Sequence, residues 1–153
     1  MEYFKQSLWR AMSAESSVER NAAQRQWEHN RAEYLDYLAK IDRFLSEDMR
    51  RFLRCCDSFH DAVFSEIAFS QDGAEKQCRV LLTSEAGRAE LLFQDVQAVV
   101  LHVASFQCAV AELLSWGYCE LKHVSRHSFR LSVACDTQNE LVIDFRRLRF
   151  QML

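Results

Sequence analysis

The apolar residues of this chain change their spacing near Asp57, and this change constrains the fold more than any other sequence feature. Before Asp57, Trp27, Tyr34 and Leu38 recur at the spacing of one helix face. After Asp57, apolar and polar residues alternate, which is the pattern of a strand with one buried face. We therefore expect an α+β fold in which N-terminal helices pack on an antiparallel sheet.

Length and composition favour one domain. The chain has 153 residues, of which 49% are hydrophobic, with 3 glycines and no proline. A chain of this size buries enough surface for a single core. We expect one domain over residues 1–153, helical in residues 1–56 and made of antiparallel strands in residues 57–153.

Capping residues predict where the helices begin. Ser16 with Glu19 forms a capping box, in which each side chain bonds a free backbone N–H group. Ser46 is followed by two acidic residues, which is typical of an N-cap with charges that favour the helix dipole. A short amphipathic helix precedes them, and its apolar side chains are expected to form an exposed patch that associates with a partner: Phe4, Leu8, Trp9 and Met12.

The strands are predicted from alternation and turns. Residues 63–93 alternate as a meander, with turns at Gly73 and Gly87 where a positive φ is needed. Residues 96–103 are apolar on both faces, which predicts a central strand or one covered on both sides. Residues 105–116 fit either a helix or a strand.

The end of the chain completes the sheet. Alternating residues from Phe129 onward predict further strands, and the alternation shifts at Arg146 and Arg147, as it does at a β-bulge. In total we expect about six or seven antiparallel strands.

The net charge and the hydropathy of the chain indicate which classes of partner and which cellular location to expect. The formal net charge is −3, so the surface offers no broad attraction for nucleic acid or for an anionic membrane. No stretch is apolar enough for a secretory leader or a membrane span, so we expect a cytoplasmic protein. The 6 cysteines lack the close pairing of zinc ligands, and we expect reduced thiols, with no metal and no cofactor.

His60 and Asp61 are the leading candidate site residues, since they lie where the helices meet the sheet. A histidine oriented by an aspartate can act as a base or hold a ligand. Neighbours in an extended chain point to opposite faces, so these two side chains are not expected to bond to each other. The alternative is structural, with Asp57 or Ser58 capping backbone groups and His60 packed under the helix.

A second candidate group lies at an expected turn between two strands. His123, Arg126 and His127 are cationic or titratable, and they could form a contact surface for an acidic partner or a solvated loop. The arginines at positions 146, 147 and 149 either bind a partner or keep an edge strand from aggregating.

Three stretches resemble a group of uncharacterised bacterial proteins: the spacing W-x6-Y-x2-YL-x2-I-x2-FL from Trp27, the sequence FHDA at residues 59–62, and ELVIDFRRL at residues 140–148. In that group, L-H-D followed by Ala or Ser comes after helices and opens a β-rich region, whereas this chain has Phe59 in place of the leucine. The resemblance implies the α+β layout, a strand in residues 112–121 and a role for His60 and Asp61. Some similar proteins are thought to be immunity proteins of toxin systems.

The sequence contains no nucleophile elbow, phosphate loop, dinucleotide motif or H-E-x-x-H motif, so we assign no catalytic residue. The leading hypothesis is a non-enzymatic protein-interaction or toxin-neutralising module, which binds a protein and forms a homo-oligomer or a complex. The alternative is a small enzyme or ligand-binding protein with a site around His60 and Asp61.

Overall fold

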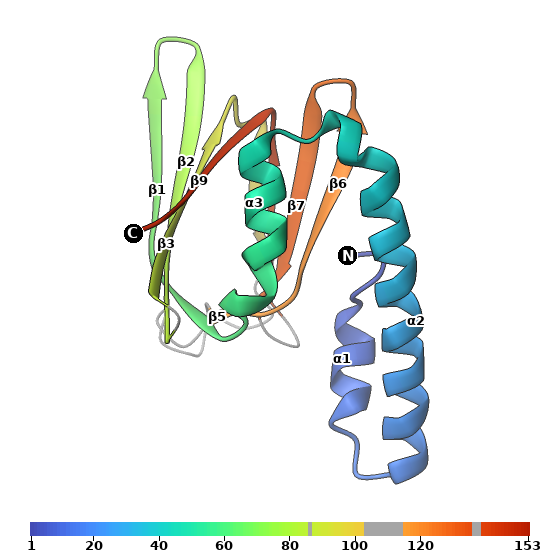
Figure 1. Cartoon of the computed structure of the whole chain (residues 1–153). Helices are drawn as coiled ribbons and strands as arrows, with labels where there is room; N and C mark the ends of the chain where they lie inside the picture. The colour runs from blue at the N-terminus through green and yellow to red at the C-terminus, as the bar shows by residue number, and fades with distance from the viewer. Residues whose placement is uncertain (86, 103–114, 136–138) are drawn as a thin grey trace.

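The computed structural model describes residues 1–85, 87–102, 115–135 and 139–153 (Figure 1). In these residues the helices precede nine antiparallel strands, which confirms the α+β class. The strands form one sheet of five and one of four, instead of the single sheet of about six or seven strands that we expected.

The helices begin where their caps predict. The Ser16 side chain accepts a hydrogen bond from the backbone N–H of Glu19, and Ser46 accepts one from that of Met49. The first two helices lie side by side and extend beyond the sheets, while the third covers the space between the sheets (Figure 1). The helical elements are α1 Gln6–Met12, α2 Ser17–Ile41, α3 Glu47–Cys55, and the 3-10 turns η1 Asp42–Phe44 and η2 Cys56–Phe59.

The first sheet, sheet A, contains the predicted meander. Gly73 and Gly87 both have positive φ, 57° and 123°, at its two turns, as predicted. The strand order is β5-β1-β2-β3-β9, so the C-terminal strand pairs with the end of the meander. The strands are β5 Ser115–Trp116, β1 Ala62–Asp72, β2 Glu75–Ser84, β3 Gly87–Gln94 and β9 Arg147–Met152.

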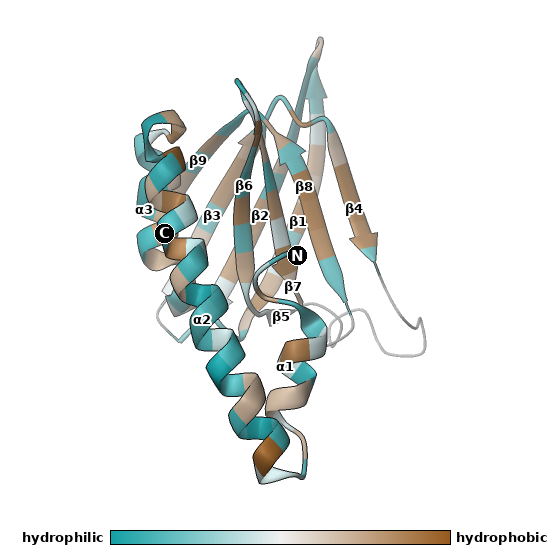
Figure 2. Ribbon diagram, turned by 90° about the vertical axis from the view of Figure 1, so that its right-hand side faces the viewer, coloured by the Kyte–Doolittle hydropathy of each residue, from teal (hydrophilic) through white to brown (hydrophobic). Residues whose placement is uncertain are grey.

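The second sheet, sheet B, has the order β4-β8-β7-β6. The strand β4 Ala98–His102 was predicted to be central or covered, but it lies at the edge, and Val100 and Leu101 are each 43% exposed (Figure 2). Long-range pairing puts β4 at the edge, and its apolar composition alone does not reveal this. The other strands are β8 Glu140–Phe145, β7 Ser128–Ala134 and β6 Cys119–Ser125.

The chain passes from sheet B to sheet A at Arg146, which joins β8 to β9. The bulge predicted at Arg146 and Arg147 is therefore wrong. The alternation shifts because two strands of different sheets turn their apolar side chains into one core. Of residues 105–116, only Ser115 and Trp116 are described, and both are in a strand; the rest of this segment lies outside the described residues.

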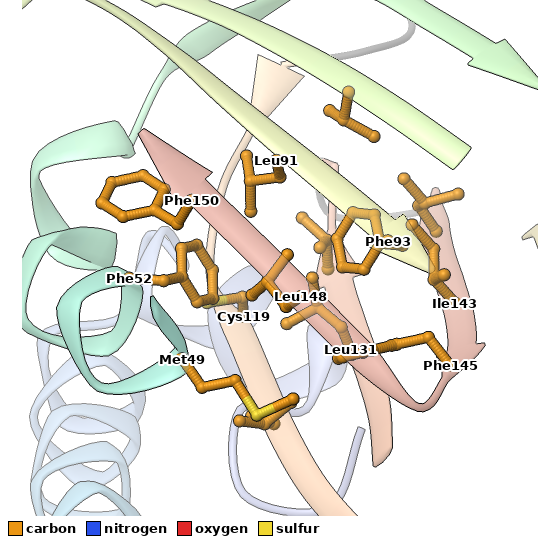
Figure 3. Close-up of a cluster of buried hydrophobic side chains, with 14 of the residues drawn as sticks. Met49, Phe52, Leu91, Phe93, Cys119, Leu131, Ile143, Phe145, Leu148 and Phe150 are labelled. Atoms are coloured by element: carbon orange, nitrogen blue, oxygen red, sulfur yellow. The ribbon is translucent and has the colours of Figure 1, made fainter. Parts of the chain in front are cut away.

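The core fills the space between the two sheets, and α3 closes it (Figure 3). Phe52 of α3 is fully buried, and its ring packs edge-on against Phe150 of β9 with 5.9 Å between the ring centres. Phe93 of β3 meets Phe145 of β8 across the sheets at 5.0 Å. Such aromatic pairs add to the stabilisation from burial itself.

A buried carboxylate fixes the N-terminal segment. Glu120 of β6 is fully buried and accepts hydrogen bonds from the backbone N–H groups of Glu2, Tyr3 and Phe4, at 2.8, 2.7 and 2.6 Å. Phe4 is only 7% exposed, and its ring lies 5.0 Å from that of Trp27. The predicted exposed N-terminal patch is therefore wrong: Phe4 is buried, and the other members are half-buried against the same cluster, namely Leu8, Trp9 and Met12.

Within the described residues, no helix combines the length and the apolarity that crossing a lipid bilayer requires.

Candidate functional site

The candidate site lies at the joint between the helices and sheet A. After η2 the chain turns at His60 and Asp61 and then enters β1. Asp61 has a φ of 66°, and its backbone N–H donates to the carbonyl oxygen of Trp116 at 2.7 Å. Phe59 is fully buried beside the turn and anchors it to the core.

The side chains of His60 and Asp61 lie close together, contrary to the prediction that they diverge. Nδ1 of His60 lies 2.9 Å from Oδ2 of Asp61. The prediction assumed an extended backbone, whereas Asp61 adopts the left-handed conformation, which aspartate tolerates better than most residues.

The second nitrogen of His60 is the unusual atom of the site. Nε2 is shielded from solvent and has no hydrogen-bond partner among the described residues. The rings of Tyr118 and Trp9 pack around the imidazole, with centres 4.8 and 6.1 Å away. Nε2 is therefore a buried polar atom whose hydrogen-bonding capacity is unused among the described residues.

A cavity of about 470 Å³ adjoins His60, between α2, the joint and the start of β6. Its wall combines aromatic, aliphatic and charged side chains, and small-molecule sites commonly have this size and a mixed lining. The aromatic side chains that line it, besides His60, are Phe4, Trp27, Tyr34 and Tyr118.

Negative charge predominates near this cavity. Glu28, Arg31 and Asp57 line it, and Arg31 pairs with Asp57 at 3.2 Å. The pKa of the Tyr118 hydroxyl is raised, first by burial and then by the negative charges of Asp61 and Asp57. The site therefore contains more carboxylates than cations.

Two thiols complete the cavity wall. Cys56, at the start of η2, and Cys119, at the start of β6, both line it. Their shared position could not be predicted from the sequence, because they belong to distant parts of the chain.

The other predicted site residues lie elsewhere. The His123 ring stacks on Phe44, 4.3 Å between centres, and its Nε2 has no hydrogen-bond partner among the described residues. Arg126 and His127 are exposed in the turn between β6 and β7. None of these three lines the cavity beside His60, so the five predicted residues do not form one site.

Two arginines of the sheets, Arg130 and Arg147, form ion pairs with carboxylates. Arg130 makes two hydrogen bonds to Asp144 on the neighbouring strand, at 2.7 and 2.8 Å. Arg147, on the edge strand β9, pairs with Glu75 and Asp95.

Sequence reasoning missed the residues that α2 and β6 bring to the site. Trp27 was interpreted as a core residue of the helix, and Glu28, Arg31 and Tyr118 were not singled out. Local spacing cannot show that α2 lies against β6. Where the chain is described, no group of three or more His, Cys, Asp or Glu side chains is arranged to hold a metal.

No protein-family model matches the chain, and no similar sequence was found among curated proteins. The resemblance to the bacterial group with the L-H-D element therefore stays a prediction.

Proposed function

We propose that this protein binds a small organic cation in the cavity at the joint. The observation that carries the proposal is the combination of aromatic side chains in the wall with an excess of carboxylates around Tyr118. The faces of Trp and Tyr rings attract cations, most strongly when the cation is shielded from water.

His60 supports a ligand that carries N–H groups. Its Nε2 has no hydrogen-bond partner among the described residues. In the tautomer that we propose, Nδ1 carries the proton and faces Asp61, so that Nε2 is an acceptor. A buried acceptor without a partner is costly, so a donor from a ligand would be favourable. An amidinium or a protonated amine has both the charge and the N–H donors.

The same geometry favours binding over catalysis. In a hydrolytic triad, Asp orients His and the second ring nitrogen of His bonds a nucleophile. Here Asp61 orients His60, but no described hydroxyl or thiol bonds Nε2.

Calorimetric titration with benzamidine tests this proposal, because benzamidine is a planar aromatic amidinium. Benzoate has a similar shape and the opposite charge, and it serves as the control ligand. We expect benzamidine to bind and benzoate not to bind. In Asp61→Asn, which keeps a residue that tolerates positive φ, we expect Kd for benzamidine to rise on the order of tenfold.

Asp72→Asn is the matched control variant, since Asp72 is exposed at the far end of β1. It should bind benzamidine like the wild type. Equal binding of benzoate, absence of benzamidine binding, or the same loss in both variants would contradict the proposal.

A second candidate function is protein interaction, the leading hypothesis from the sequence. The observation in its favour is β4, which within the described part of the chain pairs only with β8 (Figure 2). Its residues Val100 and Leu101 are exposed. An exposed apolar edge strand is a template for pairing with another chain. We propose that a second copy adds its own β4 to this edge, and a toxin-neutralising role would use the same edge.

Light scattering over a concentration series tests this candidate. The wild type should become dimeric as concentration rises, and Leu101→Lys should stay monomeric. Val18→Lys is the control, because Val18 is 75% exposed on α2, away from the edge. A wild type that stays monomeric throughout would rule out this pairing.

We further propose a cytoplasmic location. The five described cysteines are free thiols, as is usual in a reducing compartment.

A further inference from the structure

A guanidinium group of the chain itself lies beside the cavity at the joint. Arg31 of α2 and Asp57 of η2 both line this cavity, and Nη2 of Arg31 donates a hydrogen bond to Oδ2 of Asp57 at 3.2 Å. The backbone N–H of His60 donates to the carbonyl oxygen of Asp57 at 3.4 Å, so this carboxylate belongs to the same turn as the His60 imidazole. The pair shows which kind of cation a carboxylate of this site accepts.

The ion pair between Arg31 and Asp57 is exposed to solvent. The Arg31 side chain is 59% exposed and the Asp57 side chain 82%, so the pair lies on the solvent side of the cavity. Exposed pairs contribute little to stability, because water screens the charges and the long side chain loses freedom. A guanidinium can bond both oxygens of a carboxylate at once, whereas Arg31 contributes Nη2 to Oδ2. Another guanidinium can therefore replace Arg31 on Asp57 at little cost.

The rest of the wall suits an alkyl chain that carries such a cation. Leu35, Leu38 and Leu53 supply aliphatic surface to the cavity. The methylene groups of a ligand gain free energy when they leave water for a surface of this kind. Glu28, which lies one turn before Arg31 on α2, also lines the cavity and adds a second carboxylate to its wall.

We propose that the ligand of the cavity is an alkylguanidinium ion, whose planar cation takes the place of Arg31 on Asp57. Arg31 is then an internal competitor, which holds the carboxylate in the free protein and turns to solvent when the ligand binds. This inference rests on the proposed function, because it names the cation and the residue that limits its affinity. A quaternary ammonium ion has no N–H group to replace the bond to Asp57, so the exchange selects for guanidinium.

Calorimetric titration with butylguanidine tests the ligand class. Butyltrimethylammonium is the control ligand, since it has the same charge and no N–H group, and we expect it to bind more weakly. In Arg31→Gln, Kd for butylguanidine should fall about two- to fivefold, which is the contribution of an exposed ion pair expressed as an affinity ratio.

Two further variants separate competition from the loss of a positive charge. Arg25 is exposed on the same helix and does not line the cavity, so Arg25→Gln removes an equal charge and should leave Kd close to the wild-type value. In an Asp57→Asn background the competitor has lost its carboxylate. There, Arg31→Gln should improve binding no more than Arg25→Gln does. Circular dichroism checks that each variant is folded.

An arginine side chain in a peptide carries the same alkylguanidinium group as a free ligand. The peptide acetyl-Gly-Arg-Gly-amide in the same titration distinguishes the two sources. Tighter binding of the peptide than of butylguanidine would identify a peptide segment as the source, and weaker binding a free alkylguanidine. For either source, the ligand should bind more tightly to Arg31→Gln than to the wild type.

The outcomes distinguish this inference from the proposed function. If the wild type binds benzamidine, but Arg31→Gln does not bind butylguanidine more tightly or the gain persists in Asp57→Asn, the inference is wrong and the proposed function stands. Equal binding of butyltrimethylammonium and butylguanidine also contradicts the inference. If neither the wild type nor Arg31→Gln binds benzamidine or butylguanidine, the proposed function is wrong and the inference is wrong with it.

Discussion

Gly117 lies at a tightly packed point of the site. A methyl group at this position would lie 2.5 Å from the carbonyl oxygen of Ala134 and 2.6 Å from the Trp9 ring. Gly117 lines the cavity, and Trp9 packs against both of its aromatic neighbours, His60 and Tyr118. The absence of a side chain here is therefore what lets α1 close against the site.

We expect Gly117→Ala to lower the free energy of unfolding by about 1–3 kcal/mol, because the added methyl group overpacks the site. Urea denaturation measures this change. In a Trp9→Leu background, Gly117→Ala should lower the free energy of unfolding by a smaller amount, because one of the two close contacts is relieved. Some loss should remain, because the carbonyl oxygen of Ala134 stays in place. Equal stability of Gly117→Ala and the wild type would contradict the packing described here.

Asp61 shows what residue types alone leave undetermined. The sequence drew attention to His60 and Asp61, but their pairing depends on one backbone angle, the φ of 66° at Asp61. Aspartate permits that angle without requiring it. The residues of the candidate site could thus be predicted in part, whereas the close approach of the His60 and Asp61 side chains could not.

At the scale of elements, signals that act within a few residues were reliable. Ser16 and Ser46 cap their helices, and Gly73 and Gly87 turn the meander, because each of these effects involves only neighbouring backbone groups. The edge position of β4 and the passage from β8 to β9 depend on pairing between distant strands. The fold class was therefore predictable, and the division into two sheets was not.

The N-terminal segment shows that the environment of a helix, too, depends on contacts with distant parts of the chain. Its apolar residues predicted a helix that exposes a patch, but Glu120 of β6 holds the backbone of residues 2–4 and brings Phe4 into a cluster with Trp27. A single buried carboxylate on a distant strand thus decides which surface α1 presents. This contact also brings Trp9 of α1 to the site, so the shape of the site depends on an element that enters the fold through Glu120.

At the scale of the whole molecule, buried thiol and phenol groups make the free energy of unfolding depend on pH in the alkaline range. Burial raises the pKa of the Cys78 thiol from 9.0 to about 11. It also raises the pKa of Tyr34, whose hydroxyl oxygen accepts a hydrogen bond from the backbone N–H of Leu121. Each of these groups favours its protonated form in the folded chain.

The sign of the effect follows from counting protons. Between pH 9.0 and about 11 the unfolded chain has lost the Cys78 proton while the folded chain still holds it. The unfolded state binds fewer protons, so the free energy of unfolding falls as pH rises through this range, and this contribution is fully present only below it. Urea denaturation at several pH values should show the fall in the wild type and a shallower fall in Cys78→Val, which keeps an apolar side chain of similar size but cannot ionise. Identical pH dependence in the two proteins would show that the Cys78 thiol is not held neutral by the core.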